Sequence, residues 1–574
     1  MKKWVIYVVF LVPFLLNGQQ SLNVTGRVSM QVTNTDLDEN SEIKPDTIAS
    51  DQYAKGSLVP GLQQRVNLSL FARGEGLDVT LLGDLKNNRW DHIQQWKDVD
   101  RLTLNVRFSD IEITLGDFFQ TGSELFAQSR QTRGARFAVE LDNIYGTGGF
   151  LETTFNAGLV REARAIGERL RGFYHQYENS GEYRRYMANA IIRSGWRNRF
   201  HLAFKYLMAE DDEQSINDAF NEPLNNRNAG VQSTLFLWGQ NLKGFGEFYA
   251  SQKDTLSANN IQDYAYKGGV DFRYRNFKFL SFYRRIGYDY YTAGYPYLLT
   301  DREGIVVEGA YRFADAVVVG LEGEQYEDNL DNREGIPKTT IKIAEISMET
   351  YFKNWPRISL SWRYRDDRSD AVDLGEDLLS QTKKQTQTID GRINFSMGNN
   401  RFSISSLYID LNDRSLVPGG EPLGTLQLVN SMNIYLRPSS QLYLSGGTVY
   451  SYMEMTNEQL NHNIYTYASG RWDILRQKLT MEATMSLLYN EADNGGVQDM
   501  LSDYNQIAGE FGLEYFFNNN ISFKVIVGSD VRRMRYSTEE ALQVIADPDY
   551  GPQYFDTFES YTGIKYGSEI NVLF

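Results

Sequence analysis

Apolar and polar residues alternate along most of this chain with a period of two. Side chains of a β-strand point to opposite faces in turn, so each alternating stretch predicts a strand with one apolar and one polar face. The clearest stretches span residues 22–32, 102–108, 200–208, 358–364 and 479–489. After residue 16 the sequence has no run of about 18 apolar residues, the length that a membrane-spanning helix needs. The chain is therefore predicted to be almost entirely β-sheet.

The connections between these stretches alternate between short and long. Short connections rich in Gly, Asn, Asp and Ser occur near residues 74, 109, 195, 275, 314 and 398, as tight turns require. Long polar connections span residues 34–60, 210–227, 288–302, 366–385 and 533–555. This segregation is typical of an outer-membrane barrel, with short periplasmic turns and long extracellular loops. We predict an all-β, antiparallel, up-and-down transmembrane barrel of about 26 strands, with 24 left open.

Composition agrees with a barrel rather than with a helical membrane protein. The 574 residues include 37 Tyr, 32 Phe and 8 Trp, yet the mean hydropathy is only −0.46. In a barrel only alternate residues face lipid, which keeps the mean hydropathy low, and aromatic side chains gather at the two membrane interfaces. Trp238, Tyr264, Tyr266, Phe313 and Trp355 are predicted near strand ends, where such girdles lie, although simple packing explains each of them equally well.

The first 18 residues have the features of a secretory signal peptide. Lys2 and Lys3 precede an apolar run over residues 4–16, and Asn17-Gly18 offers a small residue for cleavage. The run is too short for a comfortable membrane span and contains Pro13. We therefore expect export, with residues 19–574 forming a single barrel domain in the outer membrane.

The C-terminus continues the alternation to the last residue. Even positions from Ile564 to Phe574 are mostly apolar, and the segment "KYGSEINV" precedes the terminal Leu-Phe. This segment resembles the β-signal of outer-membrane proteins, although the usual pattern places an aromatic residue nearer to position 572. The matching residues are Lys565, Gly567, Ile570, Val572 and Phe574.

With the signal peptide and the loop pattern, the whole mature chain resembles large porin-like barrels of Gram-negative bacteria. The resemblance implies that the barrel-assembly machinery reads the last strand. It also implies outer-membrane lipid and lipopolysaccharide as partners, and it places Phe574 where the last strand pairs with the first, near residues 22–32.

One internal segment stands out, "LGDFFQTGSELFAQSRQTRGARF". We predict that a strand ends near Leu115, that Gly116-Asp117 breaks it, and that Gly134 opens the next strand. The residues between are too apolar for a fully exposed loop, so the segment either folds inward and narrows the lumen or packs on the outer rim. The candidate constriction residues are Gly116, Asp117, Phe118, Phe119, Phe126, Arg133 and Gly134.

Charged residues fall opposite the apolar faces of several predicted strands, which would place them in the lumen. They are Arg101, Arg107, Arg136, Arg193, Arg273, Arg363, Arg392, Asp390, Glu510 and Glu514. Cross-strand pairing of opposite charges accounts for most such positions. A residual excess of Arg in one sector would favour anions.

Other chemistry finds little support. The chain has no Cys and only four His, and it contains no metalloprotease, nucleophile-elbow or P-loop motif. We therefore expect no enzymatic activity and no bound cofactor. The net charge of −16 argues against nucleic-acid binding. Acidic stretches at residues 36–42 and 210–222 lack the spacing of a Ca²⁺ loop and are interpreted as solvated outer loops, where divalent cations bridging to anionic lipid remain open.

Two functions are consistent with these features. The first is a porin-like channel for small polar solutes. The second is a non-enzymatic scaffold in an outer-membrane secretion, assembly or surface-display complex with partner proteins. Porins with 16–18 strands already hold an aqueous channel, so a ring of about 26 must be flattened, filled by its loops or occupied by a partner. A TonB-dependent receptor is not expected, because the first strand begins near Leu22.

Overall fold

The structure is a computed structural model of the whole chain. It describes residues 23–39, 61–88, 99–120, 122–163, 181–216, 222–258, 260–373, 379–416, 423–456, 460–493, 503–534 and 560–574. The predicted signal peptide, residues 1–18, lies outside these ranges. Within them no helix has the length and apolar character of a membrane span.

The strands follow one another along the chain with little else between them. The first half comprises β1 (Asn23–Glu39), β2 (Gly61–Gly74), β3 (Leu77–Asn88), β4 (Val99–Phe108), β5 (Ile111–Gln120), β6 (Arg130–Asp142), β7 (Gly149–Arg161), β8 (Arg184–Trp196), β9 (Phe200–Asp212), the short 3-10 helix η2 (Glu213–Ser215), β10 (Asn225–Leu237), β11 (Leu242–Asp254), β12 (Ile261–Tyr274), β13 (Phe277–Ile286) and β14 (Arg302–Phe313). The second half comprises β15 (Val317–Asp328), β16 (Thr339–Thr350), β17 (Arg357–Ser369), β18 (Val372–Asp373), β19 (Leu379–Ser380), β20 (Lys383–Met397), β21 (Asn400–Asp413), β22 (Leu423–Leu436), β23 (Leu442–Met455), β24 (Leu460–Leu475), β25 (Leu479–Asp493), β26 (Tyr504–Phe516), β27 (Ile521–Met534) and β28 (Tyr561–Leu573).

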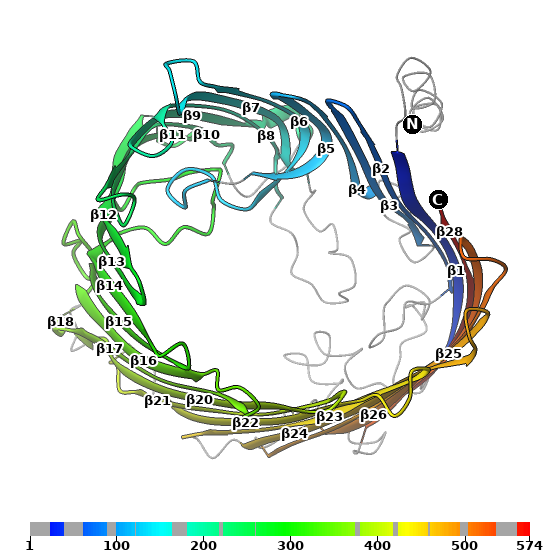
Figure 1. Ribbon diagram of the computed structural model, residues 1–574. Coiled ribbons are helices and arrows are strands. Elements are labelled where there is room, and N and C mark those ends of the chain that lie inside the picture. The colour runs from blue at the N-terminus through cyan, green and yellow to red at the C-terminus, as the bar shows by residue number, and fades with distance from the viewer. Residues whose placement is uncertain are drawn as a thin grey trace.

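All strands except the small β18–β19 pair belong to one closed, antiparallel sheet of 26 strands. Each strand pairs with its sequence neighbour, and β28 closes the ring by pairing with β1, from Arg27 opposite Leu573 to Glu39 opposite Tyr561 (Figure 1). The Gly26 amide donates to the Phe574 carbonyl at 2.8 Å, and the Phe574 amide donates back at 3.1 Å. The predicted fold, the count of 26 rather than 24 and the pairing of the last strand with the first are confirmed.

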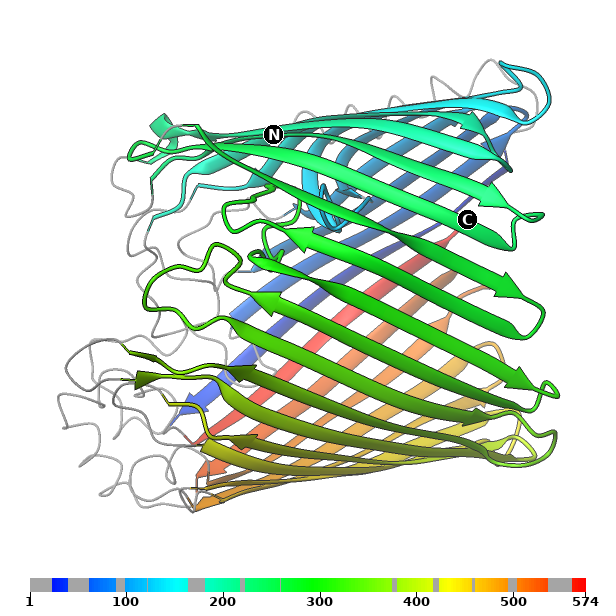
Figure 2. The ribbon, with the colours of Figure 1, turned by 90° about the vertical axis from the view of Figure 1, so that its left-hand side faces the viewer.

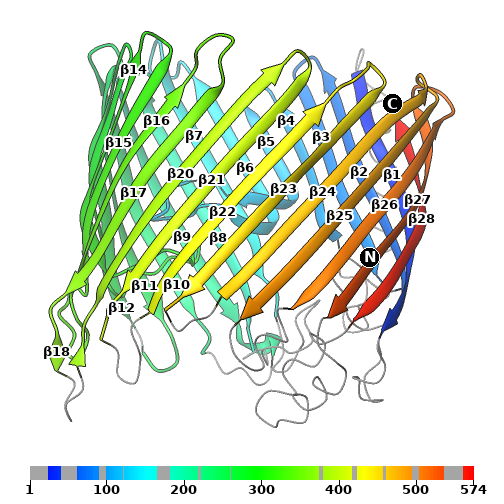
Figure 3. The same ribbon diagram turned by 90° about the horizontal axis from the view of Figure 1, so that it is seen from below.

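Short and long connections lie at opposite ends of the tilted strands (Figures 2 and 3). We call these the short-turn end and the long-loop end. The strands run further toward the long-loop end than the alternation predicted: β1 extends through Glu39, β9 through Asp212 and β17 through Ser369. The predicted loops beginning at residues 34, 210 and 366 therefore start too early. Backbone pairing continues beyond the part of each strand whose outer side chains are apolar, so the hydropathy pattern ends before the strand does.

Register sorts the side chains into an inner and an outer face. The side chains of Lys205 and Tyr249 contact Phe126, which lies inside the ring, so these two residues belong to the inner face. Residues that pair across neighbouring strands share a face, so the register assigns the inner face of every other strand. The opposite face is apolar and open: Phe204 is 56% exposed and Met30 53% exposed, as a lipid-facing surface requires. Trp355, 74% exposed, and Trp238, 65% exposed, lie in short turns, whereas Tyr264 lies near the start of β12, toward the long-loop end.

Candidate functional site

The β5–β6 hairpin leaves the wall of the barrel. β5 pairs with β4 only from Ile111 to Gly116, and from there to Gln120 it pairs with β6 alone. The predictions that a strand ends near Leu115 and that Gly134 opens the next were therefore wrong, because β5 runs to Gln120 and β6 begins at Arg130. Gly116 does not break the strand. At its φ of 97° it redirects the strand, a conformation that glycine adopts without steric cost.

Three glycines lie side by side where the hairpin departs: Gly116 pairs with Gly134, which pairs with Gly158. A Cβ on Gly116 would stand 1.9 Å from the Leu102 carbonyl oxygen, and one on Gly134 would stand 2.0 Å from the Ala157 oxygen. No side chain fits at those distances. At these three glycines the backbones of β5, β6 and β7 therefore approach their neighbouring strands more closely than any residue with a Cβ would allow.

Asp117 fixes the departing strand to its neighbours. Its carboxylate accepts hydrogen bonds from the Leu102 amide and the Arg133 Nε, both at 2.8 Å, and its carbonyl accepts one from the Thr103 hydroxyl at 2.5 Å. Asp117 is almost fully buried, so these donors replace its lost water. Among the predicted constriction residues, Gly116, Asp117, Arg133 and Gly134 thus form the base of the hairpin.

The tip of the hairpin, residues 122–129, lies inside the ring close to β8–β12, where Figure 1 shows it in cyan. Leu125 and Phe126 are 0% exposed. They belong to an apolar cluster with inner-face residues of five strands, namely Met187, Leu207, Ala209, Tyr249, Ala265 and Ile286. The segment therefore folds inward, as one of the two sequence interpretations has it. Phe118 is also buried, whereas Phe119 is 54% exposed.

A second connection, residues 287–301 between β13 and β14, packs against this tip from the long-loop end. Thr292 donates its hydroxyl to the Phe126 carbonyl at 2.5 Å, Tyr290 donates to the Leu125 carbonyl, and Ala127 forms a parallel bridge with Gly294. Two buried side chains of β10, Asn226 and Asn228, hold the Tyr291 carbonyl at 3.2 and 2.8 Å. We call the two connections together the inner lining.

Charge also holds the inner lining to the wall. Glu124 lies 3.2 Å from the ammonium of Lys267 and 3.1 Å from the guanidinium of Arg284. Burial by itself would raise the pKa of the Glu124 carboxyl, but its attraction to Arg284 and Lys267 outweighs burial and lowers the pKa. Another cation of the wall, Lys205, is 5% exposed, donates to the Tyr249 hydroxyl at 2.8 Å and lies 5.7 Å from the centre of the Phe126 ring.

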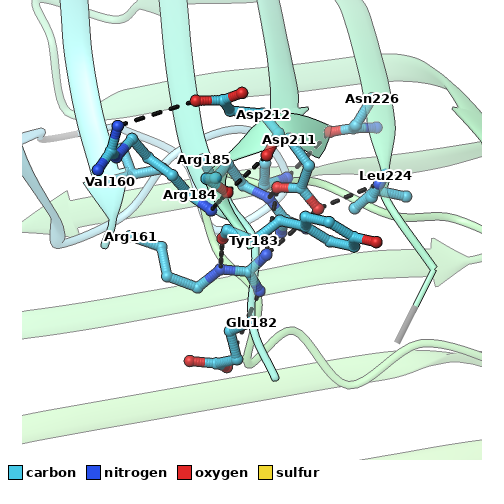
Figure 4. A network of polar contacts seen from close by, with 12 residues as sticks. Val160, Arg161, Glu182, Tyr183, Arg184, Arg185, Asp211, Asp212, Leu224 and Asn226 are labelled. Atoms are coloured by element: carbon cyan, nitrogen blue, oxygen red, sulfur yellow. Dashed lines mark hydrogen bonds and ion pairs between the residues drawn. The ribbon is translucent and has the colours of Figure 1, made fainter. Parts of the chain in front are cut away.

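Next to the inner lining, Asp211 is the centre of a buried polar network (Figure 4). Its carboxylate accepts two hydrogen bonds from Arg185, at 2.7 and 2.8 Å, and two from Arg161, at 3.2 Å. Arg185 also donates to the Tyr291 hydroxyl at 2.8 Å, which ties the network to the inner lining. The interpretation of residues 210–212 as a loop was therefore wrong, because they end β9. Glu210 is exposed as expected, whereas the Asp211 side chain is only 1% exposed.

Other acidic positions divide between described and undescribed parts of the chain. Asp36 and Asp38 lie in β1, while Glu42 and Asp218 lie outside the described residues. In the described part of the chain no group of three or more His, Asp or Glu side chains could hold a metal ion.

The predicted lumen charges all lie on the inner face by register. Some take part in cross-strand contacts: Arg193 with Glu152 at 3.1 Å, Lys565 with Glu510 at 2.8 Å, and Arg363 with Glu345 at 3.9 Å. The inner faces of β12–β17 carry many charged side chains of both signs at the positions that the register assigns to the lumen. The remaining predicted positions are Arg101, Arg107, Arg136, Arg273, Asp390, Arg392 and Glu514.

The inner faces of β21–β25 differ. Those of β22 and β23 hold no charged side chain, and the charges of β21, β24 and β25 lie only near strand ends, at Arg401, Asp413, Arg471, Asp473 and Glu482. Between them lies a surface of hydroxyls, amides and Tyr rings, which we call the neutral field. Its residues are Ser403, Ser405, Gln427, Ser431, Asn433, Tyr435, Ser445, Ser451, Asn463, Tyr465, Tyr467, Ser469, Thr484 and Ser486, with Leu407, Val429, Val449 and Leu488 among them.

A hollow of about 1340 Å³ lies against the short-turn edge of the neutral field. Its lining includes Ser403, Tyr435, Ser445, Ser469 and Thr484 of the field, and at the strand ends the charged residues Arg357, Arg401, Arg437, Arg471 and Glu482. Sequence reasoning missed both this field and the Arg161–Arg185–Asp211 network. Counting the charged residues at the inner positions of each predicted strand would have revealed the neutral field from the sequence. The network has no sequence signal, because its members come from three strands.

No protein-family model matches this sequence, and no curated protein matches it significantly. Among solved structures, a mutant form of the ferric enterobactin receptor PfeA from Pseudomonas aeruginosa is 10% identical over 97% of this chain and 81% of that chain, with a TM-score of 0.46. The copper transporter OprC is 8% identical over 96% and 80%, with a TM-score of 0.44. The siderophore receptor PirA from Pseudomonas aeruginosa is 11% identical over 97% and 81%, with a TM-score of 0.41. At these scores the fold assignment rests on this chain's own strand pairing.

Proposed function

We propose that this protein is an outer-membrane channel for small polar solutes, exported through its N-terminal signal peptide and without catalytic activity or cofactor. The observation that carries the proposal is the inner lining. Residues 122–129 and 287–301 are fastened to the inside of a closed ring by buried apolar contacts, hydrogen bonds and the Glu124 ion pairs. A fixed element inside a barrel supports control over what passes through it.

Conductance in planar bilayers tests the proposal. In one variant an Asn-Gly turn replaces residues 122–128, which joins β5 to β6 directly. Channel conductance is expected to rise severalfold, because the cluster that narrows this sector is removed. The control, Ile336→Asp, changes an exposed loop residue at the same end of the barrel and should leave conductance unchanged. A folded barrel without conductance in either form would overturn the proposal.

A scaffold role is the second candidate, favoured by the width of a 26-stranded ring. A scaffold is expected to be silent in bilayers, and the shortened variant should then release a co-purifying protein. Purification of the native complex therefore separates the two candidates.

A further inference from the structure

The neutral field lies on a different sector of the wall from the inner lining. Figure 1 shows β22, β23 and β24 across the ring from the cyan segment. Its aromatic side chains are open: Tyr435 is 50% exposed and Tyr465 is 38% exposed. By contrast, Tyr249 beneath the inner lining is 0% exposed. The field is thus a surface with room for a ligand.

The hydrogen-bonding side chains of the neutral field form rows, in which groups on neighbouring strands hydrogen-bond to one another. Ser405 and Ser431 share a hydrogen bond at 2.7 Å, Tyr467 donates to Asn433 at 2.9 Å, and Asn463 donates to Asn490 at 3.0 Å. A hydroxyl has one donor and two acceptor sites, so a paired Ser or Tyr keeps capacity for a ligand. Because these contacts fix the side chains, the ligand meets groups that are already oriented.

Two aromatic rings provide an apolar platform within these rows. Tyr465 and Tyr467 are stacked, with ring centroids 6.1 Å apart and planes 27° apart. Aromatic faces bury apolar C–H surfaces. The Tyr467 hydroxyl, which donates to Asn433, keeps its acceptor sites for a ligand. Flanking aliphatic residues, Val449 and Leu488, pair with Tyr465 on either side.

The charge distribution decides the class of ligand. An anionic or cationic solute binds most favourably next to side chains of opposite charge, such as those on β12–β17. On a surface without charge, the cost of removing water from its charged group is poorly compensated. An apolar solute would leave the rows of hydroxyls and amides unpaired. A polyhydroxylated neutral molecule satisfies both conditions, because its hydroxyls match the rows and its ring C–H faces match the tyrosines.

We propose that the neutral field binds neutral oligosaccharides. The inference rests on the proposed channel function and names its solute class. The charged inner faces of β12–β17 do not bind this solute, and the neutral field binds it along the wall formed by β21–β25.

The test uses saturation-transfer NMR on the purified full-length barrel in detergent, with maltohexaose as the neutral probe and hexagalacturonate as the anionic probe of equal length. Maltohexaose is expected to receive saturation, and hexagalacturonate at least tenfold less. Ser486→Glu places a carboxylate in the field and should weaken maltohexaose binding at least tenfold. Ser486→Asn keeps the site neutral and should retain binding.

Ser347→Glu is the matched control, because Ser347 is an inner-face residue of β16 next to the charges of β12–β17. It should leave maltohexaose binding unchanged. Heat-modifiable migration on gels confirms that each variant is folded. Absence of maltohexaose binding, equal binding of the two probes, or unchanged binding in Ser486→Glu would each overturn the inference. So would a co-purifying protein that Ser486→Glu releases.

Conductance separates this inference from the proposed function. A barrel that conducts ions but binds no maltohexaose refutes only the ligand class. A barrel that binds maltohexaose but conducts nothing refutes the channel and leaves the ligand class standing. In a conducting barrel, maltohexaose should block the current reversibly, and Ser486→Glu should abolish the block.

Discussion

The wall beneath the inner lining and the neutral field are built from the same kind of strand, yet they use polar residues in opposite ways. Under the lining, Lys205, Asn226 and Asp211 are buried and each has a defined partner. In the neutral field the polar groups are uncharged and partly open. Buried charge demands fixed partners, so the first sector is rigid. Open hydroxyls exchange water for ligand at little cost, so the second is suited to transient binding.

The largest expected effect comes from the Arg185–Asp211 pair. Arg185→Ala leaves the Asp211 carboxylate buried with less compensation, and we expect the barrel to lose about 3–5 kcal/mol of unfolding free energy. Arg471→Ala is the matched control at the edge of the neutral field, where the Arg471 side chain is 50% exposed and its Nη1 lies 3.4 Å from Oε1 of Glu482. It should cost about 0–1 kcal/mol. Urea unfolding in lipid vesicles measures both, and equal losses would remove the contrast between the sectors.

The same substitution in the two sectors gives a second comparison. Tyr249→Phe removes the acceptor of the buried Lys205 ammonium, and we expect a loss of about 1.5–3 kcal/mol. Tyr465→Phe should change unfolding by no more than about 0.5 kcal/mol and should act on oligosaccharide binding instead. Unfolding titrations of both variants provide the measurement. A larger loss for Tyr465→Phe would show that the neutral field is structural.

The glycine line predicts a local weakness. Gly134→Ala forces a Cβ against the Ala157 carbonyl oxygen, and we expect about 1–3 kcal/mol of destabilisation together with loosening of the β5–β6 hairpin. Gly323→Ala is the control, since a Cβ there meets nothing within 4 Å. Hydrogen exchange of residues 117–133 reports the loosening. Unchanged protection in Gly134→Ala would show that the hairpin does not depend on this close approach.

The smallest effect is the pH dependence of the inner lining. The folded pKa of Glu124 is lowered below its ordinary value of 4.5, so its stabilising contribution is fully present above that value and is lost as the pH falls through the folded pKa. Protease access to residues 122–129 should therefore rise as the pH falls below 4.5 and through the lowered pKa of Glu124. Glu124→Gln should be more accessible at neutral pH and nearly insensitive to acid. An acid response of the variant equal to wild type would assign the effect to another group.

Much of the architecture could be predicted because it is local. Period-two alternation, turn residues and the length of connections specify strands and their order, and they indicated the strand number. The resemblance of the chain to large porin-like barrels implied the ring closure by Phe574. The ends of strands were less predictable, because β9 continues past its apolar part to Asp212. The role of the C-terminal segment in assembly stays a prediction.

The sequence by itself determined a barrel, an inner and an outer face, and the charges that line the lumen, because each follows from residues a few positions apart. Only the tertiary structure decided where the inner lining lies, since Phe126, Tyr290 and Tyr249 meet from three distant parts of the chain. The same holds for Asp211, whose surroundings made a solvated acid into a buried ion-pair centre. Side-chain periodicity is fixed by the backbone, whereas burial is fixed by neighbours that the chain brings together only when the ring closes.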